Sequence, residues 1–497
     1  MSESYGDGWR PKHDRGIRRL AVVGFLWSAS QTLLLQGLAL VTQLVLAHLI
    51  APKYFGVIAV AATVSAVCTA LVDSGLSAAV IRAPTLTRID LETAWWLNMG
   101  LAAIFGGGLI ALGPAIGLLV GKGELVDVLP LYALTVVVTA AASVPLALIQ
   151  RRMAFRTRLW ITLPASALGA MAAIGFAVVS PSVFALAMQP LVAGIVTVVI
   201  LGFMRAHIVG FHFDRRAARM MLSFGLPLAG SSTIDTLWNG LPAVYIAAAL
   251  GVTPAGIYFM ADRLRNALVM TVFSAVATVA FPAFSTVAHD RRQFVSYIRS
   301  AIRASAALSA PVFLIVAVQA QNIFKLILGP EWSHGALYLS VMMVGAIMYP
   351  PNSVNIAAMK AAGRTKLILL LEVGKKVVVL ALLVAVLPMG LVPYLWAMVA
   401  FGVVAYIPNS WFVSNSLDYR YRDQVADIGL PGIIGAAVAA ILWGVCVSFS
   451  IPPAVAVFIL SPLAIGVGWS GTLAITPSLR RVVSARISAR FANIRGR

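Results

Sequence analysis

Acidic residues are scarce in this sequence, and charged residues of either sign are few. Asp and Glu number 17 among 497 residues, against 37 Lys and Arg, and all four types together make up 11% of the chain. A soluble domain normally carries about 25% charged residues, so this chain has too little polar surface to cover its 60% hydrophobic residues in water. The surplus of apolar side chains must face lipid, which excludes an enzyme that works in solution.

Cysteine is rare, and the common nucleotide-binding loop is missing. The two cysteines, Cys68 and Cys446, both lie in apolar segments, so we predict neither a disulfide framework nor a metal cluster. The pattern Gly-x-x-x-x-Gly-Lys followed by Ser or Thr is absent, which excludes the usual phosphate-binding loop of proteins that use ATP. The sequence therefore predicts no cofactor, and a gradient of protons or sodium is the expected energy source.

Long apolar runs are abundant instead. Stretches of roughly 20 apolar residues are long enough to cross a bilayer as helices, and they predict an all-α polytopic membrane protein with about fourteen transmembrane helices. These stretches lie near residues 20–47, 55–80, 93–120, 127–149, 159–180, 183–204, 221–250, 255–284, 301–319, 335–358, 366–388, 391–413, 428–449 and 452–474.

Basic residues are distributed unequally between alternate gaps. If the N-terminal tail lies in the cytoplasm, the opposite side receives only Lys53, Lys122 and Lys325. Four bases fall within spans, and every other Lys and Arg lies on the cytoplasmic side, as the positive-inside rule requires. Topology thus explains the net charge of +20, and nucleic acid is not expected as a partner. Residues 1–19 and 475–497 are predicted to be basic cytoplasmic tails that contact anionic lipids.

The sequence carries signs of an internal duplication. Gly24-Phe25-Leu26 lies about 200 residues before Gly225-Leu226-Pro227, and Arg156-Thr157-Arg158-Leu159 matches Arg364-Thr365-Lys366-Leu367 at a similar offset. Transporters with such repeats bind substrate between the two halves. We therefore predict two six-helix lobes around a central cavity, at 20–204 and 221–413, with a cytoplasmic linker at 205–220 and an added helix pair at 428–474. The alternative is that apolar helices resemble one another by composition alone.

Charged residues inside the predicted spans are the candidate functional residues, because a charge at membrane depth costs about 2.5–3.5 kcal/mol or more. In the eighth span, Asp262, Arg265 and Asn266 share one helical face, whereas Arg263 points away from it. Three further spans offer polar stripes, so that four helices could line a cavity. Their candidates are Glu372, Lys375 and Lys376 in the eleventh span, Asp235 and Asn239 in the seventh, and Gln36 and Gln43 in the first.

Structural roles are an alternative for these residues. Asp262 with Arg265, and Glu372 with Lys376, have the spacings of local ion pairs that only stabilise helix packing. Glutamines within a span often join two helices by hydrogen bonds. Asp73, near the inner end of the second span, is either a helix-break or cap residue, or a coupling or gating residue.

The eighth and eleventh spans are locally positive. Asp262 is outnumbered by two arginines and Glu372 by two lysines. Such an excess of cations in a hydrophobic setting favours an anionic substrate, and a guanidinium group suits phosphate oxygens through paired hydrogen bonds.

Several motifs follow one another along residues 20–415. They are Ala47-His48-Leu49-Ile50-Ala51-Pro52-Lys53-Tyr54-Phe55-Gly56, Leu71-Val72-Asp73-Ser74-Gly75-Leu76-Ser77-Ala78-Ala79-Val80-Ile81, Thr93-Ala94-Trp95-Trp96-Leu97-Asn98, Phe281-Pro282-Ala283-Phe284-Ser285, Leu328-Gly329-Pro330-Glu331-Trp332 and Ala361-Ala362-Gly363-Arg364. Taken in this order, the motifs resemble those of the polysaccharide transporter family, the O-antigen and exopolysaccharide flippases of bacterial inner membranes.

The resemblance implies the fold of multidrug-and-toxin extruders and the lipid II flippase. It implies a substrate made of an oligosaccharide unit on an undecaprenyl pyrophosphate carrier, which is turned across the bacterial inner membrane by alternating access. Polysaccharide polymerase and export machinery are the implied protein partners. The chain departs from the family pattern at His48, where Arg is frequent, and at Met260, where a polar residue is frequent.

The resemblance and the charges together assign roles to the candidates. No catalytic or metal-ligating residue is predicted, and the chain is not expected to be an enzyme. A drug or cation antiporter would need carboxylates to outnumber bases, and a membrane polymerase or ligase would need a long outer loop, whereas the outer gaps are short. The predicted pyrophosphate ligands are Arg263, Arg265, Lys375 and Lys376, the further substrate contacts are Gln36, Gln43 and Asn239, and the coupling or gating candidates are Asp73, Asp235, Asp262 and Glu372.

Overall fold

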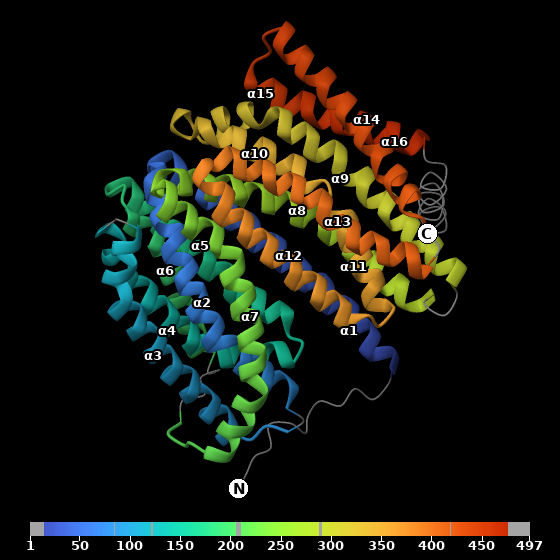
Figure 1. Ribbon diagram of the computed structural model, residues 1–497. Coiled ribbons are helices and arrows are strands. Elements are labelled where there is room, and N and C mark those ends of the chain that lie inside the picture. The colour runs from blue at the N-terminus through green and yellow to red at the C-terminus, as the bar shows by residue number, and fades with distance from the viewer. Residues whose placement is uncertain are drawn as a thin grey trace, which may run out of the picture. The chain divides into compact units, whose positions relative to one another are not determined.

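The computed structural model describes residues 14–83, 85–120, 123–204, 210–287, 291–417 and 419–475. Within these ranges every regular element is a helix (Figure 1). Helices are expected in lipid because a helix satisfies its backbone N–H and C=O groups internally. The predicted all-α fold class is confirmed, whereas the predicted basic tails lie mostly outside the described residues.

The chain divides into two compact units, residues 1–259 and 260–497, and each is described here by itself. The first unit contains seven long helices and the beginning of an eighth. They are α1 (Asp14–Leu49), α2 (Pro52–Arg82), α3 (Arg88–Val120), α4 (Gly123–Arg151), α5 (Phe155–Val179), α6 (Val183–Phe203), α7 (Arg215–Leu250) and α8 (Val252–Val287), which continues into the second unit.

The second unit is built around α9, which packs against α10, α11, α14 and α16. Short helical turns separate some of its longer helices. Its elements after α8 are α9 (Arg291–Ile327), η1 (Pro330–Trp332), α10 (Ser333–Ala346), α11 (Tyr349–Ala361), α12 (Thr365–Val386), η2 (Leu387–Met389), α13 (Leu391–Leu417), α14 (Tyr421–Ser448), α15 (Pro453–Val455), η3 (Ala456–Leu460) and α16 (Ser461–Ile475).

Two predicted spans differ in detail from the helices. The span predicted at 335–358 is two helices, α10 and α11, which meet just before Tyr349-Pro350-Pro351. Proline lacks a backbone N–H and restricts the residue before it, so this pair favours a new helix start over continuation. The last span, predicted at 452–474, contains a π-helical turn at Ala456–Leu460.

Ten of the described helices are long and apolar enough to cross a membrane. The predicted spans at 221–250, 255–284, 335–358 and 366–388 are not among the ten. Three of these four hold three of the four polar stripes, and the other is the span that breaks at its proline pair. The candidate functional residues of the second unit and of α7 therefore lie on helices outside the ten.

The boundary between the units does not coincide with the linker predicted at 205–220. Helix α7, which the repeat assigns to the second lobe, begins at Arg215 and packs against α2 in the first unit. A duplication concerns the ancestry of a sequence, whereas a compact unit reflects packing, so the two divisions can differ. The two lobes stay a prediction.

Helix α2 meets α7 and the start of α8 through glycines. A Cβ atom added at Gly75 would overlap the backbone of Gly225, and one added at Gly56 would overlap the backbone of Val252 and approach Gly256. Small residues let two membrane helices approach until their backbones touch. We call these contacts the glycine seam.

A buried glutamate holds the segment that leads into α7. Glu92, in the first turns of α3, has a side chain that is 1% exposed. Its carboxylate accepts hydrogen bonds from Arg88 Nε at 2.8 Å and from the His212 backbone N–H at 3.2 Å, and His212 Nδ1 lies 2.9 Å from it. Trp96 Nε1 also donates to the Gly210 carbonyl oxygen at 2.8 Å. The start of α7 is therefore tied to α3.

A buried aspartate joins α14 to α9 in the second unit. Asp427 accepts hydrogen bonds from Arg299 Nε at 2.8 Å, from Arg303 Nε at 2.7 Å and from the Tyr419 hydroxyl at 2.6 Å. Burial and the bond to Asp427 raise the pKa of Tyr419, so this hydroxyl stays protonated and donates. Three donors on one buried carboxylate hold the C-terminal helices to the rest of the unit.

Replacement of Gly75 by alanine should destabilise the protein. The new methyl group has no room against Gly225, and overpacking of this kind costs about 1–3 kcal/mol. Gly107, in α3, has nothing within 4 Å of the position that a methyl group would take, so Gly107→Ala is the matched control. Thermal unfolding of the purified variants in detergent should show a lower midpoint for Gly75→Ala only; equal midpoints would contradict the seam.

Replacement of Asp427 by asparagine should also lower stability. The change leaves Arg299 and Arg303 without their shared carboxylate, and loss of one partner of a buried ion pair costs about 3–5 kcal/mol. Asp423 lies one turn earlier in α14 and is more exposed, so Asp423→Asn should cost less than about 1 kcal/mol, the scale of a charge in a first helical turn. Unfolding midpoints of the two variants compare the costs, and similar values would argue against the proposed role of Asp427.

Candidate functional site

Asp262, Arg265 and Asn266 of α8 bind one another through an ion pair and hydrogen bonds. Arg265 Nη2 lies 2.8 Å from Asp262 Oδ1, and Asn266 donates from Nδ2 to Asp262 Oδ2 at 2.8 Å. Arg265 also donates to Asn266 Oδ1 at 3.0 Å, while its buried Nε has no hydrogen-bond partner among the described residues. The predicted shared face is thus present, and Asp262 with Arg265 does form a local ion pair. Arg263 is exposed on another face.

The charged residues of α12 are paired as well, with one difference from the prediction. Lys375 Nζ lies 2.8 Å from Glu372 Oε1, whereas the spacing predicted Lys376 as the partner of Glu372. Lys376 is half-buried and is also engaged with a neighbour. Spacings of three and four residues both place side chains on one helical face, so the sequence cannot choose between the two lysines.

Two tyrosines of the second unit lie near the charged residues of α8 and α12. Tyr349, the first residue of α11, interacts electrostatically with both Arg265 and Glu372. Tyr394, in α13, interacts with Arg265 and Asp262. Charged residues of α8 and α12 and tyrosines of α11 and α13 therefore lie within electrostatic range of one another. Sequence reasoning found the charges but missed the tyrosines, which only tertiary packing brings near them.

The first unit holds the other candidates. Gln36 and Asn239 are exposed on α1 and α7, as is Asp235, which is also engaged with a neighbour. Gln43 is half-buried, and its Oε1 atom is buried without a hydrogen-bond partner within the described ranges. These residues belong to one unit and the charges of α8 and α12 to the other, so a site that combines them stays a prediction.

Asp73 does not cap a helix. Helix α2 continues past it to Arg82, and Asp73 accepts a hydrogen bond from Ser77 Oγ at 2.6 Å, one turn further along. Of the two roles left open by the sequence, the helix cap is therefore wrong. Asp73 instead lines a cavity, as described next.

A polar cavity of about 360 Å³ lies inside the first unit, among α1, α2, α4, α5 and α6. Asp73 of α2 and Arg158 of α5 are the two charged residues in its lining, and Gln150 lies at the end of α4. Seven hydroxyl-bearing residues complete the polar part of the wall. They are Ser77, Thr135, Thr139, Ser143, Thr162, Ser166 and Thr197. Sequence reasoning missed this cavity because single hydroxyls recur in many membrane helices and carry little signal alone.

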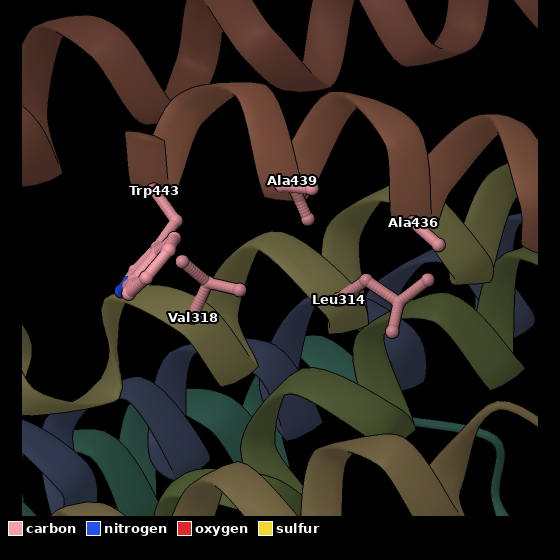
Figure 2. Close-up of a pocket in the computed structure, with 6 residues that line it drawn as sticks. Leu314, Val318, Ala436, Ala439 and Trp443 are labelled. Atoms are coloured by element: carbon pink, nitrogen blue, oxygen red, sulfur yellow. The ribbon is translucent and has the colours of Figure 1, made fainter. Parts of the chain in front are cut away.

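A second pocket, in the second unit, is apolar. Figure 2 shows it between α9 and α14, with Ala436, Ala439 and Trp443 of α14 facing Leu314 and Val318 of α9. Its volume is about 400 Å³. A wall of this composition offers hydrophobic contact but no hydrogen bond to a polar ligand.

The described residues offer no metal site. No group of three or more His, Cys, Asp or Glu residues there could hold a metal ion. The bases Arg265 of α8 and Lys375 of α12 are oriented by their carboxylate partners. Bases held in this way can bind an anion.

Solved structures of transporters share this fold. The structure of a lipid II flippase, MurJ in an inward closed conformation, superposes with a TM-score of 0.69 at 11% identity, over 92% of this chain and 100% of that chain. An inward-facing multidrug resistance transporter of the MATE family superposes with a TM-score of 0.57 at 15% identity, over 78% of this chain and 95% of that one. The predicted transporter fold is thereby confirmed.

Sequence relatives are named for transport and for polysaccharide biosynthesis. A succinoglycan biosynthesis transport protein of Rhizobium meliloti, ExoT, is 25% identical over 328 residues, which span 66% of this chain and 66% of that protein. A lipopolysaccharide biosynthesis protein of Escherichia coli, WzxC, is 26% identical over 338 residues, 67% of this chain and 68% of that protein. The alignment thus spans about two thirds of the length of these relatives.

ExoT is named as a transport protein and MurJ as a flippase, in agreement with the prediction that the chain is not an enzyme. The model of the polysaccharide biosynthesis protein family matches residues 45–337, more than half of the 497 residues. The chain is therefore a multi-pass membrane protein that belongs to the polysaccharide biosynthesis protein family.

Proposed function

We propose that this protein is a flippase that moves undecaprenyl-pyrophosphate-linked oligosaccharide units across the bacterial inner membrane by alternating access. The product would supply exopolysaccharide or lipopolysaccharide synthesis. The observation that supports this most directly is a group of bases on membrane helices of a fold shared with a lipid II flippase. An acidic lipid head group is a ligand that such bases can bind.

The pyrophosphate ligands in this proposal are Arg263, Arg265, Lys375 and Lys376. Two of them are held by acids, Arg265 by Asp262 and Lys375 by Glu372. These pairs do not remove the positive balance, because Asp262 is accompanied on α8 by two arginines and Glu372 on α12 by two neighbouring lysines. A buried cation without a partner is strongly unfavourable, so the local pairs keep the bases in place until phosphate oxygens take over their hydrogen bonds.

Further substrate contacts are assigned to Gln36, Gln43 and Asn239 of the first unit. The unpartnered Oε1 atom of Gln43 supports this assignment, because a buried acceptor without a donor is costly and a substrate group could supply one. The carboxylates of Asp73, Asp235, Asp262 and Glu372 are the candidates for coupling to a proton or sodium gradient.

In this proposal both termini lie in the cytoplasm, next to anionic lipids of the inner leaflet, and the basic loops and tails support that orientation. Enzymes that polymerise and export the glycan would act on the product and are the proposed protein partners.

A drug or cation antiporter is the second candidate, because the MATE transporter shares the fold. The excess of bases at α8 and α12 favours the anionic substrate over a cationic one.

Replacement of both Arg265 and Lys376 by alanine should abolish polymer export while leaving membrane insertion intact. The double variant removes one base from each of the two charged helices, so that Asp262 and Glu372 are each left with one base and the local excess of positive charge is lost. Export is measured as surface polymer in cells that lack their own transporter, and insertion is measured by blotting of the membrane fraction. The control Arg156→Ala with Arg364→Ala removes two exposed bases outside these helices and should export normally.

A charge swap separates pyrophosphate binding from helix packing. Asp262→Arg combined with Arg265→Asp preserves a local ion pair at the same spacing but displaces the guanidinium group by about one helical turn. If Arg265 binds the head group, the swap should insert and fail to export. Normal export by the charge-swap variant, or by the double alanine variant, would contradict the assignment of Arg265 as a ligand of the head group.

A further inference from the structure

The polar cavity of the first unit is unexplained by the pyrophosphate ligands, since none of them lines it. We propose that this cavity binds a sugar ring of the glycan, at a site separate from the bases that hold the pyrophosphate. The proposal rests on the proposed function, because the transported lipid is what brings a glycan to the protein. It assigns the choice of glycan to residues of α2, α4 and α5.

The hydroxyl groups of the cavity wall are mostly available as acceptors. Thr135, Thr139 and Thr197 each donate their hydroxyl hydrogen to the carbonyl oxygen four residues earlier, at 2.7–2.8 Å. Ser77 likewise donates to Asp73. A hydroxyl has one hydrogen and two lone pairs, so these four oxygens can offer only lone pairs to a ligand. Together with Asp73 they call for a ligand that donates hydrogen bonds.

The same wall holds a donor that is not satisfied. Arg158 donates from Nη1 to Gln150 Oε1 at 2.7 Å. Its Nε atom is buried and has no hydrogen-bond partner in the part of the chain that the structure describes. The Arg158 side chain itself lines the cavity and its guanidinium group carries further N–H donors, so a ligand can also accept a hydrogen bond from it.

The charge of the cavity selects a neutral ligand. Among the described residues no ion pair joins Asp73 to Arg158, although both line the cavity. One negative and one positive group leave the site neutral overall, so a bound metal cation or phosphate would add an uncompensated charge. A sugar is neutral, and each of its hydroxyls both donates and accepts. A sugar can therefore donate hydrogen bonds to the acceptors of the wall, accept one from Arg158, and leave the cavity neutral.

The size of the cavity limits what enters. About 360 Å³ lies at the lower end of the roughly 300–1,000 Å³ typical of small-molecule sites. The cavity can take one or two rings and not a whole repeat unit. Gln150 and Arg158 flank the turn between α4 and α5, which the predicted topology places on the cytoplasmic side. A sugar would therefore be recognised on the side from which the lipid-linked unit enters.

A single cysteine in the cavity tests the proposal. Thr139→Cys is placed in a protein whose own Cys68 and Cys446 are replaced by serine, and its modification by a maleimide is timed in nanodiscs. The probes are methyl glycosides of glucose, galactose and mannose, with sodium chloride and potassium phosphate as comparisons. At least one glycoside should slow modification about threefold, as expected when free ligand reaches about twice its dissociation constant, whereas the salts should not.

Matched controls keep the test decisive. Leu134→Cys lies on the same helix, is exposed and does not line the cavity, so no probe should protect it. Thr135→Cys is a second cavity position in case Thr139→Cys folds poorly. Protection by sodium chloride or phosphate alone, or by none of the probes, would overturn the sugar site.

Transport of a labelled lipid-linked glycan by the unmodified protein in vesicles separates the two proposals. Transport without glycoside protection would refute the sugar site and leave the flippase proposal standing. Glycoside protection without transport would refute the flippase proposal and leave a sugar-binding cavity.

Discussion

Hydrocarbon supplies no hydrogen bonds, and this constraint governs every polar group that the protein carries into the membrane. It explains why the described backbone is helical and why the charges of α8 and α12 occur as pairs. Burial applies the same rule at helix ends, where Asp427 accepts three hydrogen bonds and Glu92 contacts Arg88 and His212. Nε of Arg158 and Oε1 of Gln43 are buried without a hydrogen-bond partner among the described residues, which is energetically unfavourable.

The same constraint made much of the fold predictable. Apolar runs of sufficient length indicated the helices, and the proposed membrane fold agrees with solved transporters. The break before Tyr349 was not predicted, although its signal, two successive prolines, was present in the sequence. The early start of α7 at Arg215 was also missed, because a basic segment reads as a loop when only hydropathy is considered.

Side-chain partners were less predictable than helices. Spacing correctly placed Asp262 and Arg265 on one face, but it could not decide between Lys375 and Lys376 as the partner of Glu372. Asp427 was overlooked because it stands next to a predicted span end, where a charge needs no explanation. Its importance comes from Arg299 and Arg303, more than 120 residues earlier. The cavity around Arg158 depends on five helices, and no local pattern encodes such a meeting.

The glycine seam has a mechanical consequence. Helices that interlock through large side chains must change rotamers before one can slide past the other. Helix α2 meets α7 at Gly75 and Gly225 with little but backbone between them. Next to these glycines, Leu76 and Val80 of α2 pack into one buried cluster with Met221 of α7. The glycines therefore set how close the two helices lie, while the neighbouring side chains oppose any sliding of α2 along its own length.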